Sequence, residues 1–242
     1  MGTHGHLTVP YAEVDAVAVV VPARDEEAVL PACLQAVAAA RVPVARLGVP
    51  VATVVIADSC RDQTADVARA ATGVEVVESR AGTVGGARAA GVALAMRMLG
   101  GVATRRVWVA CTDADSVVPR DWLSAQVAVA RAGYDAVAGL IALDGAGLST
   151  ATERWRRAYD VDCGRDRLHG RVHGANLGVR GDAYRAIGGF AAVAVGEDVD
   201  LVHRLRAAGR TIAWPERPVV LTSARLTART RSGVAADLRA LA

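Results

Sequence analysis

Lysine is absent from the 242-residue sequence, in which all 28 basic residues are arginine. A P-loop needs a lysine directly after its glycine-rich turn, so this absence excludes the P-loop NTPases. Enzymes that form a Schiff base through a lysine amine are excluded for the same reason.

Paired cysteines, long apolar runs and a strong excess of one charge are absent as well. The four cysteines (Cys33, Cys60, Cys111 and Cys163) form no C-x-x-C pair, which favours reduced thiols over a disulfide framework or a zinc site. No run reaches the ~18 apolar residues that span a bilayer, and MGTHGHLTVP at the start lacks the pattern of a signal peptide. The net charge of +3 does not favour nucleic acid. We therefore expect a cytoplasmic protein with no transmembrane segment and no nucleic-acid partner, and leave contact with a membrane surface open.

The first half of the chain alternates apolar runs with segments of helical spacing. "AVAVVVP" (16–22) is continuously apolar, as is typical of a strand covered on both faces. Strands separated by helices of this length indicate right-handed βαβ units and a mostly parallel sheet. We therefore predict an α/β fold with a Rossmann-like sheet, with strands at 16–22, 51–59, 74–79 and 106–112 and helices at 26–40, 64–71 and 85–99.

The second half is less regular, and no low-complexity linker separates it from the first. We predict strands at 135–143, at 175–180 and within 211–223, helices at 151–159, 181–189 and 197–209, and loops at 145–150 and 164–174. The chain therefore reads as a 15-residue N-terminal extension followed by a single domain over 16–242. Residues 16–116 form the half that contains a sheet of the nucleotide-binding type, and residues 117–242 form the half that binds a partner.

Polar residues follow each of the first four predicted strands. The segments are PARDEE (22–27), DSCRDQT (58–64), SRAGTVGGAR (79–88) and TDADS (112–116). Ligands of open parallel sheets bind outside the carboxyl ends of the strands. Four consecutive polar strand ends therefore suggest a ligand at this edge.

Asp113 and Asp115 form a D-x-D pair at the end of the fourth strand. Residues two apart in a strand share one face, so both carboxylates can reach the same ion. Hard oxygen ligands suit Mg2+ or Mn2+. The alternative is that these acids only end the strand or cap a helix that begins near Asp121, and the D-x-D pattern alone does not exclude it.

Five segments in order resemble family 2 glycosyltransferases with the nucleotide-sugar-binding GT-A fold. The resemblance covers roughly residues 16 to 214, and its segments read VVVPARDEEAVLPACL, VVIADSCRDQTADVA, GGARAAGVALA, WVACTDADSVVP and GANLGVRGDAYRAIGGF…GEDVDLVHRLRAAG. No single motif is specific, but five in the family's order are. The resemblance implies a GT-A-type single domain and transfer of a sugar from a nucleoside-diphosphate donor to an acceptor hydroxyl.

The resemblance also implies which residues bind the donor. Asp113 and Asp115 match the acids that bind Mn2+ or Mg2+ against the diphosphate of a UDP- or GDP-type sugar, where the ion neutralises the charge of the leaving group. Contacts to the nucleotide sugar are implied for Ala23, Arg24, Asp25, Asp58, Arg80, Asp113, Ala114 and Asp115, with Glu27 in support. Among these, Asp58 would accept a hydrogen bond from the base, and Arg80 would flank it.

Glu197 and Asp198 match the family's catalytic acidic motif. The resemblance implies that Asp198 is the general base toward the acceptor hydroxyl and that Glu197 shapes the acceptor site, in an in-line displacement that inverts the anomeric carbon. The alternative is that these acids, with Asp200, only favour the positive end of their helix. In "HGAN" (173–176), His173 and Asn176 are candidate contacts to the donor sugar or the acceptor, although a lone loop histidine is as often simply solvated.

The sequence departs from some relatives near its C-terminus. Those relatives complete metal coordination with a later histidine, and no histidine follows His203. The tail offers arginines instead, and we expect Arg225 and Arg229 to close over the diphosphate, since guanidinium groups suit phosphate oxygens. A solvated basic loop is the alternative.

Two other functions compete with glycosyl transfer. A sugar-phosphate nucleotidyltransferase also combines a metal with a nucleotide-binding sheet, but it usually has a glycine-rich, basic loop after the first strand, where "PARDEEAVL" is acidic and lacks glycine. A nucleotide-sugar-binding protein without turnover is the other alternative, against which the presence of both Asp115 and Asp198 argues. A Rossmann dehydrogenase is disfavoured because "GTVGGARAAG" follows the third strand and lacks the G-x-G-x-x-G spacing.

Overall fold

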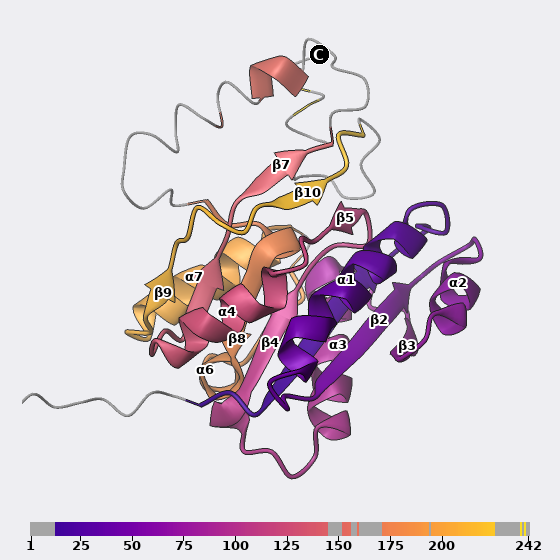
Figure 1. Cartoon of the computed structure of the whole chain (residues 1–242). Helices are drawn as coiled ribbons and strands as arrows, with labels where there is room; N and C mark the ends of the chain where they lie inside the picture. Colours follow the sequence, from indigo (N-terminus) through magenta and orange to yellow (C-terminus); the bar gives the residue numbers. More distant parts are fainter. Residues whose placement is uncertain are drawn as a thin grey trace, which may run out of the picture.

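The first half of the chain folds into the predicted alternation of strands and helices (Figure 1). The structure is a computed structural model that describes residues 13–144, 152–155, 159, 171–193, 195–225, 238 and 240. Its first elements are β1 (Ala16–Ala23), α1 (Leu30–Ala45), β2 (Val51–Asp58), α2 (Thr64–Ala70), β3 (Val74–Ser79), α3 (Val84–Met98), the short 3-10 helix η1 (Thr104–Arg106) and β4 (Val107–Cys111).

The second half departs from the prediction at one strand. Residues 135–143 were expected to form one strand, but the chain divides there into β6 (Ala136–Ala138) and β7 (Ile141–Leu143), which belong to different sheets. The other elements are β5 (Ser116–Val117), α4 (Trp122–Arg131), η2 (Gly174–Asn176), β8 (Leu177–Arg180), α6 (Gly181–Ala186), α7 (Glu197–Ala207), β9 (Ile212–Ala213) and β10 (Val220–Thr222). The loop predicted at 145–150 and most of the one at 164–174 lie outside the described residues.

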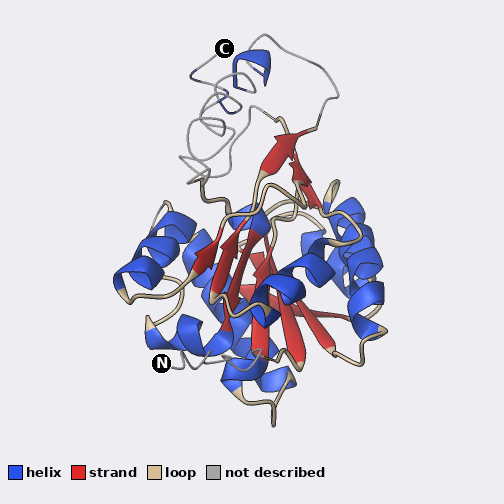
Figure 2. Cartoon of the chain, turned by 60° about the vertical axis from the view of Figure 1, so that its left-hand side comes forward, coloured by secondary structure: helices blue, strands red, loops and turns tan. Residues whose placement is uncertain are grey.

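The main sheet has seven strands in the order β3-β2-β1-β4-β8-β6-β9, and a second sheet has the order β5-β10-β7. β3, β2, β1 and β4 are parallel, and β8 runs antiparallel to its neighbours β4 and β6. Helices cover both faces of the main sheet (Figure 2). The predicted α/β class with a mostly parallel central sheet is therefore confirmed.

β1 is the centre of the core because both of its faces are buried. Val17, Val19 and Val21 pack toward α1 and α4, whereas the alternate residues of the strand pack toward α3 and α7. A Cβ added to Gly91 of α3 would lie 2.3 Å from Cδ1 of Ile56, so α3 rests directly on the sheet. This close packing brings the N-terminal end of α3 to the edge where the parallel strands end.

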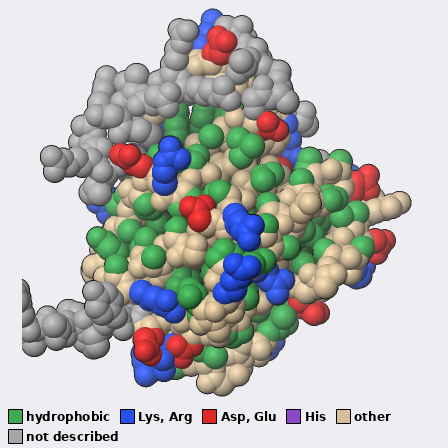
Figure 3. All heavy atoms as spheres, in the orientation of Figure 1, with side chains coloured by type: hydrophobic (Ala, Val, Ile, Leu, Met, Phe, Trp, Pro, Cys, Tyr) green, Lys and Arg blue, Asp and Glu red, His purple; other side chains and the backbone are tan. Residues whose placement is uncertain are grey.

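The surface shown in Figure 3 intersperses arginine and acidic side chains among apolar ones. The cysteines within the described residues, Cys33, Cys60 and Cys111, are free thiols. Within those same residues, no helix combines the length and the hydropathy needed to cross a membrane.

Asn176 fixes the junction between the two sheets. Its side chain is 2% exposed, and Oδ1 accepts a hydrogen bond from Nε1 of Trp122 in α4 at 3.0 Å. Nδ2 donates to the carbonyl oxygens of Leu140 and Pro218 at 2.9 and 3.0 Å. The amide therefore points into the interior, where it satisfies three protein groups.

Replacing Asn176 by leucine should lower the free energy of unfolding by about 2 kcal/mol or more, because buried hydrogen-bonding groups would lose their partner. Gln126→Met is the matched control, since Gln126 is another buried amide, and among the described residues its side chain makes one hydrogen bond, from Nε1 of Trp108 at 2.8 Å. Urea unfolding of both variants checks the prediction, and an Asn176→Leu effect no larger than that of Gln126→Met would contradict it.

Candidate active site

The loops that follow β1 and β2 are bound to each other at the carboxyl edge of the sheet. Oδ1 of Asp25 accepts from the amide of Arg61 at 2.6 Å, and Oδ2 of Asp62 accepts from the amide of Glu27 at 3.1 Å. Asp25 has a φ of 52°, an unusual left-handed conformation that these contacts hold in place. The two loops therefore form a single preformed wall.

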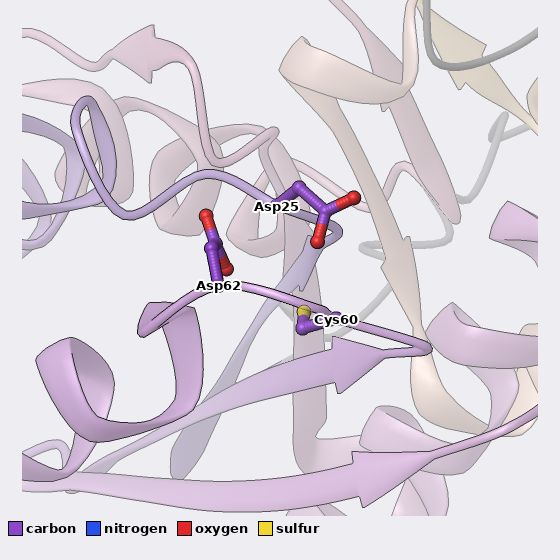
Figure 4. A group of neighbouring side chains, drawn as sticks. All are labelled: Asp25, Cys60 and Asp62. Atoms are coloured by element: carbon purple, nitrogen blue, oxygen red, sulfur yellow. The ribbon is translucent and has the colours of Figure 1, made fainter.

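Asp25, Cys60 and Asp62 converge between these two loops (Figure 4). One ligand atom from each lies within 4.8 Å of the others. The two carboxylates already accept hydrogen bonds from backbone amides. Burial raises the pKa of the Cys60 thiol, so this thiol stays protonated at neutral pH. We therefore assign these three side chains to holding the wall together.

Asp58 organises the loop after β3. Asp58 is 5% exposed, and its carboxylate accepts hydrogen bonds from the amides of Ala81 and Gly82 at 2.7 and 3.0 Å. A carboxylate has about four lone-pair positions, so it can accept a further hydrogen bond, and the expected contact with a base stays a prediction. Arg80 and Arg24 lie exposed on the loops after β3 and β1.

Asp113 and Asp115 follow β4 on either side of the buried Ala114. Oδ1 of Asp113 lies 2.5 Å from the guanidinium of Arg88, and Oδ2 of Asp115 lies 2.9 Å from that of Arg225. Burial and the neighbouring charge of Asp113 together raise the pKa of Asp115 to about 6. Two carboxylates that repel each other in a partly buried site form a donor set suited to a hard divalent cation.

Arg225 reaches this pair from the segment after β10. Its guanidinium forms a fork on Glu26, with N–O distances of 2.6 and 2.5 Å, in addition to the contact with Asp115. Glu26 is 6% exposed and belongs to the loop after β1. Glu26 was not predicted from the sequence, because only the folded chain shows that it faces Arg225. Arg229 lies outside the described residues.

Arg88 of α3 connects Asp113 to the opposite side of the site. The guanidinium is 1% exposed, and its Nε lies 3.3 Å from Oε1 of Glu197 while one terminal nitrogen donates to the carbonyl oxygen of Gly174 at 3.1 Å. Burial alone would lower its pKa, but the charges of Asp113 and Glu197 raise it. Arg88 was also missed, since "GGARAAG" shows only a glycine-rich helix start.

Asp198 lies in the first turn of α7, where two backbone amides hold its carboxylate. Oδ2 accepts from Gly174 at 2.7 Å and Oδ1 from Val199 at 2.8 Å. Glu197 beside it is 8% exposed, and its pKa is raised by burial against the opposing effect of Arg88.

The predicted acceptor-side residues behave differently from each other. Nε2 of His173 lies 3.2 Å from the hydroxyl of Tyr159, and the chain continues directly into Gly174. His173 is therefore in the segment that contacts Asp198, whereas the side chain of Asn176 turns away into the core. Arg88 thus contacts Asp113 of the acidic pair on one side and is connected through Gly174 to the fixed carboxylate of Asp198 on the other. This arrangement suits a cation-assisted departure of one group and removal of a proton from another.

Solved structures share the fold at low sequence identity. The mannosyltransferase PcManGT from Pyrobaculum calidifontis, in complex with GDP-Man and Mn2+, matches 88% of this chain with a TM-score of 0.61 and 21% identity. TarS 1–349 from S. aureus matches 86% with a TM-score of 0.59 and 15% identity, and mannosyl-3-phosphoglycerate synthase from Rubrobacter xylanophilus matches 93% with a TM-score of 0.55 and 17% identity. The chain spans 57%, 60% and 70% of the lengths of these three proteins, respectively.

These structures confirm the GT-A-type fold class. No curated protein sequence matches the chain. The family model described as "Glycosyltransferase like family 2" matches residues 15–238, and the protein therefore belongs to this family.

Proposed function

We propose that the protein is an inverting glycosyltransferase that moves a sugar from a nucleoside-diphosphate sugar to an acceptor hydroxyl. The proposal rests most on the acidic pair Asp113 and Asp115 and on the carboxylate of Asp198. Asp113 pairs with the buried Arg88, which donates to the carbonyl oxygen of Gly174, and the amide of Gly174 donates to Asp198. Family membership and the GDP-Man complex of PcManGT support a nucleotide-sugar donor of the UDP or GDP type.

The donor half of the site would be formed by the strand ends. Ala23 and Asp58 end β1 and β2, and Arg24, Asp25 and Arg80 lie in the loops after β1 and β3, where the base and ribose would lie. Asp113 and Asp115 would hold Mn2+ or Mg2+, and the ion would neutralise the charge of the departing diphosphate.

The acceptor half would use Asp198 as the base. Its carboxylate is fixed by the amides of Gly174 and Val199, so its orientation does not depend on the acceptor. It would take the proton of the hydroxyl as the oxygen attacks the anomeric carbon and the bond to the diphosphate breaks on the opposite face. Glu197 directly precedes Asp198 in the chain, and His173 directly precedes Gly174, whose amide donates to Asp198.

Arg225 would bind the diphosphate. In this structure its guanidinium is engaged by Glu26 and Asp115 at the metal-binding side of the site. A guanidinium with several donors can keep its contact with Glu26 and also bind a phosphate oxygen.

Calorimetric titration of UDP and GDP, with and without Mn2+, tests the donor site. One of the two should bind with Mn2+ present, and Asp115→Ala should weaken that binding by about tenfold or more because the ion loses a ligand. Asp121→Ala is the matched control, since Asp121 is an exposed acid that directly precedes α4. If the wild-type protein binds neither nucleotide, the proposed function is wrong.

Hydrolysis of the donor, with water as acceptor, tests the base. Asp198→Asn should lower kcat by about 10²–10⁴-fold while nucleotide affinity persists, because only proton removal is lost. Asp200→Asn, which alters an acid of the same helix that pairs with Arg204, should leave kcat nearly unchanged. Equal activity of Asp198→Asn and the wild-type protein would rule out Asp198 as the base.

The variants Arg225→Ala and Arg229→Ala test whether these two arginines bind the diphosphate. Arg225→Ala should weaken the binding of the diphosphate nucleotide by about tenfold and that of the monophosphate much less, since the lost contact is to a charged phosphate oxygen. Unchanged affinity and turnover in both variants would show that neither arginine contacts the diphosphate.

A further inference from the structure

We propose that Arg88 is a positioning residue that sets the place of the base Asp198 relative to the acid Asp113. The inference rests on the proposed function and adds a role for a side chain that is 1% exposed.

Each nitrogen of the guanidinium binds a different part of the site. One terminal nitrogen contacts Asp113 after β4, the other donates to the carbonyl oxygen of Gly174 in η2, and Nε contacts Glu197 in α7. Phe190 lies over the group, with its ring centre 5.8 Å from Cζ. The arginine is therefore held on several sides by segments that are distant in the sequence.

Gly174 extends the connection to the base. Its carbonyl oxygen accepts from Arg88, and its amide donates to Oδ2 of Asp198 at 2.7 Å. A continuous series of contacts thus runs from Asp113 through Arg88 and Gly174 to Asp198. A shift of the guanidinium would move the amide that orients the base.

The sequence leaves room for this connection at two glycines. A Cβ on Gly174 would lie 2.3 Å from a terminal nitrogen of Arg88. A Cβ on Gly85, one turn before Arg88 in α3, would lie 2.0 Å from the carbonyl oxygen of Ala191 and 3.0 Å from Cβ of Glu197. The absence of side chains at both positions allows η2 and α7 to approach the arginine closely.

A guanidinium suits this role and an ammonium does not. Arginine offers five N–H donors in a rigid planar fork, whereas lysine offers a single charged centre. Arg88→Lys therefore keeps the positive charge beside Asp113 but cannot reproduce the contacts with Asp113, Gly174 and Glu197 together. This variant separates geometry from charge.

The test compares nucleotide binding with turnover in Arg88→Lys. The Kd for UDP or GDP in the presence of Mn2+ should stay within about threefold of wild type, while kcat for hydrolysis of UDP-glucose or GDP-mannose should fall by about tenfold or more. Gly174→Ala should give the same split, since its Cβ would displace the guanidinium. Because the two changes affect one contact, their effects in the double variant should not add.

Arg180→Lys is the matched control. Arg180 is 5% exposed and donates to the carbonyl oxygens of Arg105, Ala130 and Tyr134, at the opposite end of β4 from Asp113. This variant should lower the midpoint temperature of thermal unfolding. Its kcat should not fall relative to its affinity for the nucleotide. A loss of stability alone therefore does not reproduce the result expected for Arg88→Lys.

Two results would overturn the inference while leaving the proposed function intact. One is an unchanged kcat in both Arg88→Lys and Gly174→Ala, and the other is a loss of nucleotide affinity as large as the loss of kcat. A wild-type protein that binds no nucleotide would instead overturn the proposed function, and this inference with it.

Discussion

The site depends on the neutralisation of one buried positive charge. Burying an unpaired arginine costs several kcal/mol, about as much as a domain can lose before it unfolds. The chain meets this requirement at Arg88 with two acids and a backbone carbonyl, which come from the end of β4, from α7 and from η2. The segments that carry the proposed chemistry therefore fold together around a guanidinium that would otherwise destabilise the protein.

Small residues in the interior make this arrangement possible. β1 contributes only alanine and valine to the two faces of the sheet around Val19, and α3 approaches the sheet through Gly91. Because α3 lies this close to the strands, Arg88 is placed at the edge of the sheet where Asp113 follows β4. The alanine- and valine-rich composition is thus connected to the site through the packing distance of α3.

The sequence predicted the parts of this protein that depend on local pattern. The four strands of the first half and the polar segments after them were identifiable because parallel strands buried on both faces are continuously apolar. Asp113, Asp115 and Asp198 were predicted as site residues because their spacing and order follow a family pattern. The strand predicted at 135–143 was wrong as a single element, because Gly139 and Leu140 separate two short strands that an apolar run alone does not distinguish.

Side-chain direction could not be predicted from the same patterns. Glu26 and Arg225 are 199 residues apart, and nothing local marks them as partners. Arg88 lies in a helix whose composition suggests only close packing, and Asn176 lies in a polar motif yet turns into the core. In each case the tertiary contact decides the role, and only the folded chain supplies it.

The wall formed by the loops after β1 and β2 has a consequence for how fast a ligand associates. Its mutual contacts, including the one between the amide of Glu26 and the hydroxyl of Thr64, order both loops when the chain folds. Fixing a residue's backbone costs roughly 1–2 kcal/mol, which a flexible loop would lose at each binding event. A ligand that approaches this side of the site therefore meets an ordered surface. Its association rate should be set by diffusion and orientation instead of by a slow loop rearrangement.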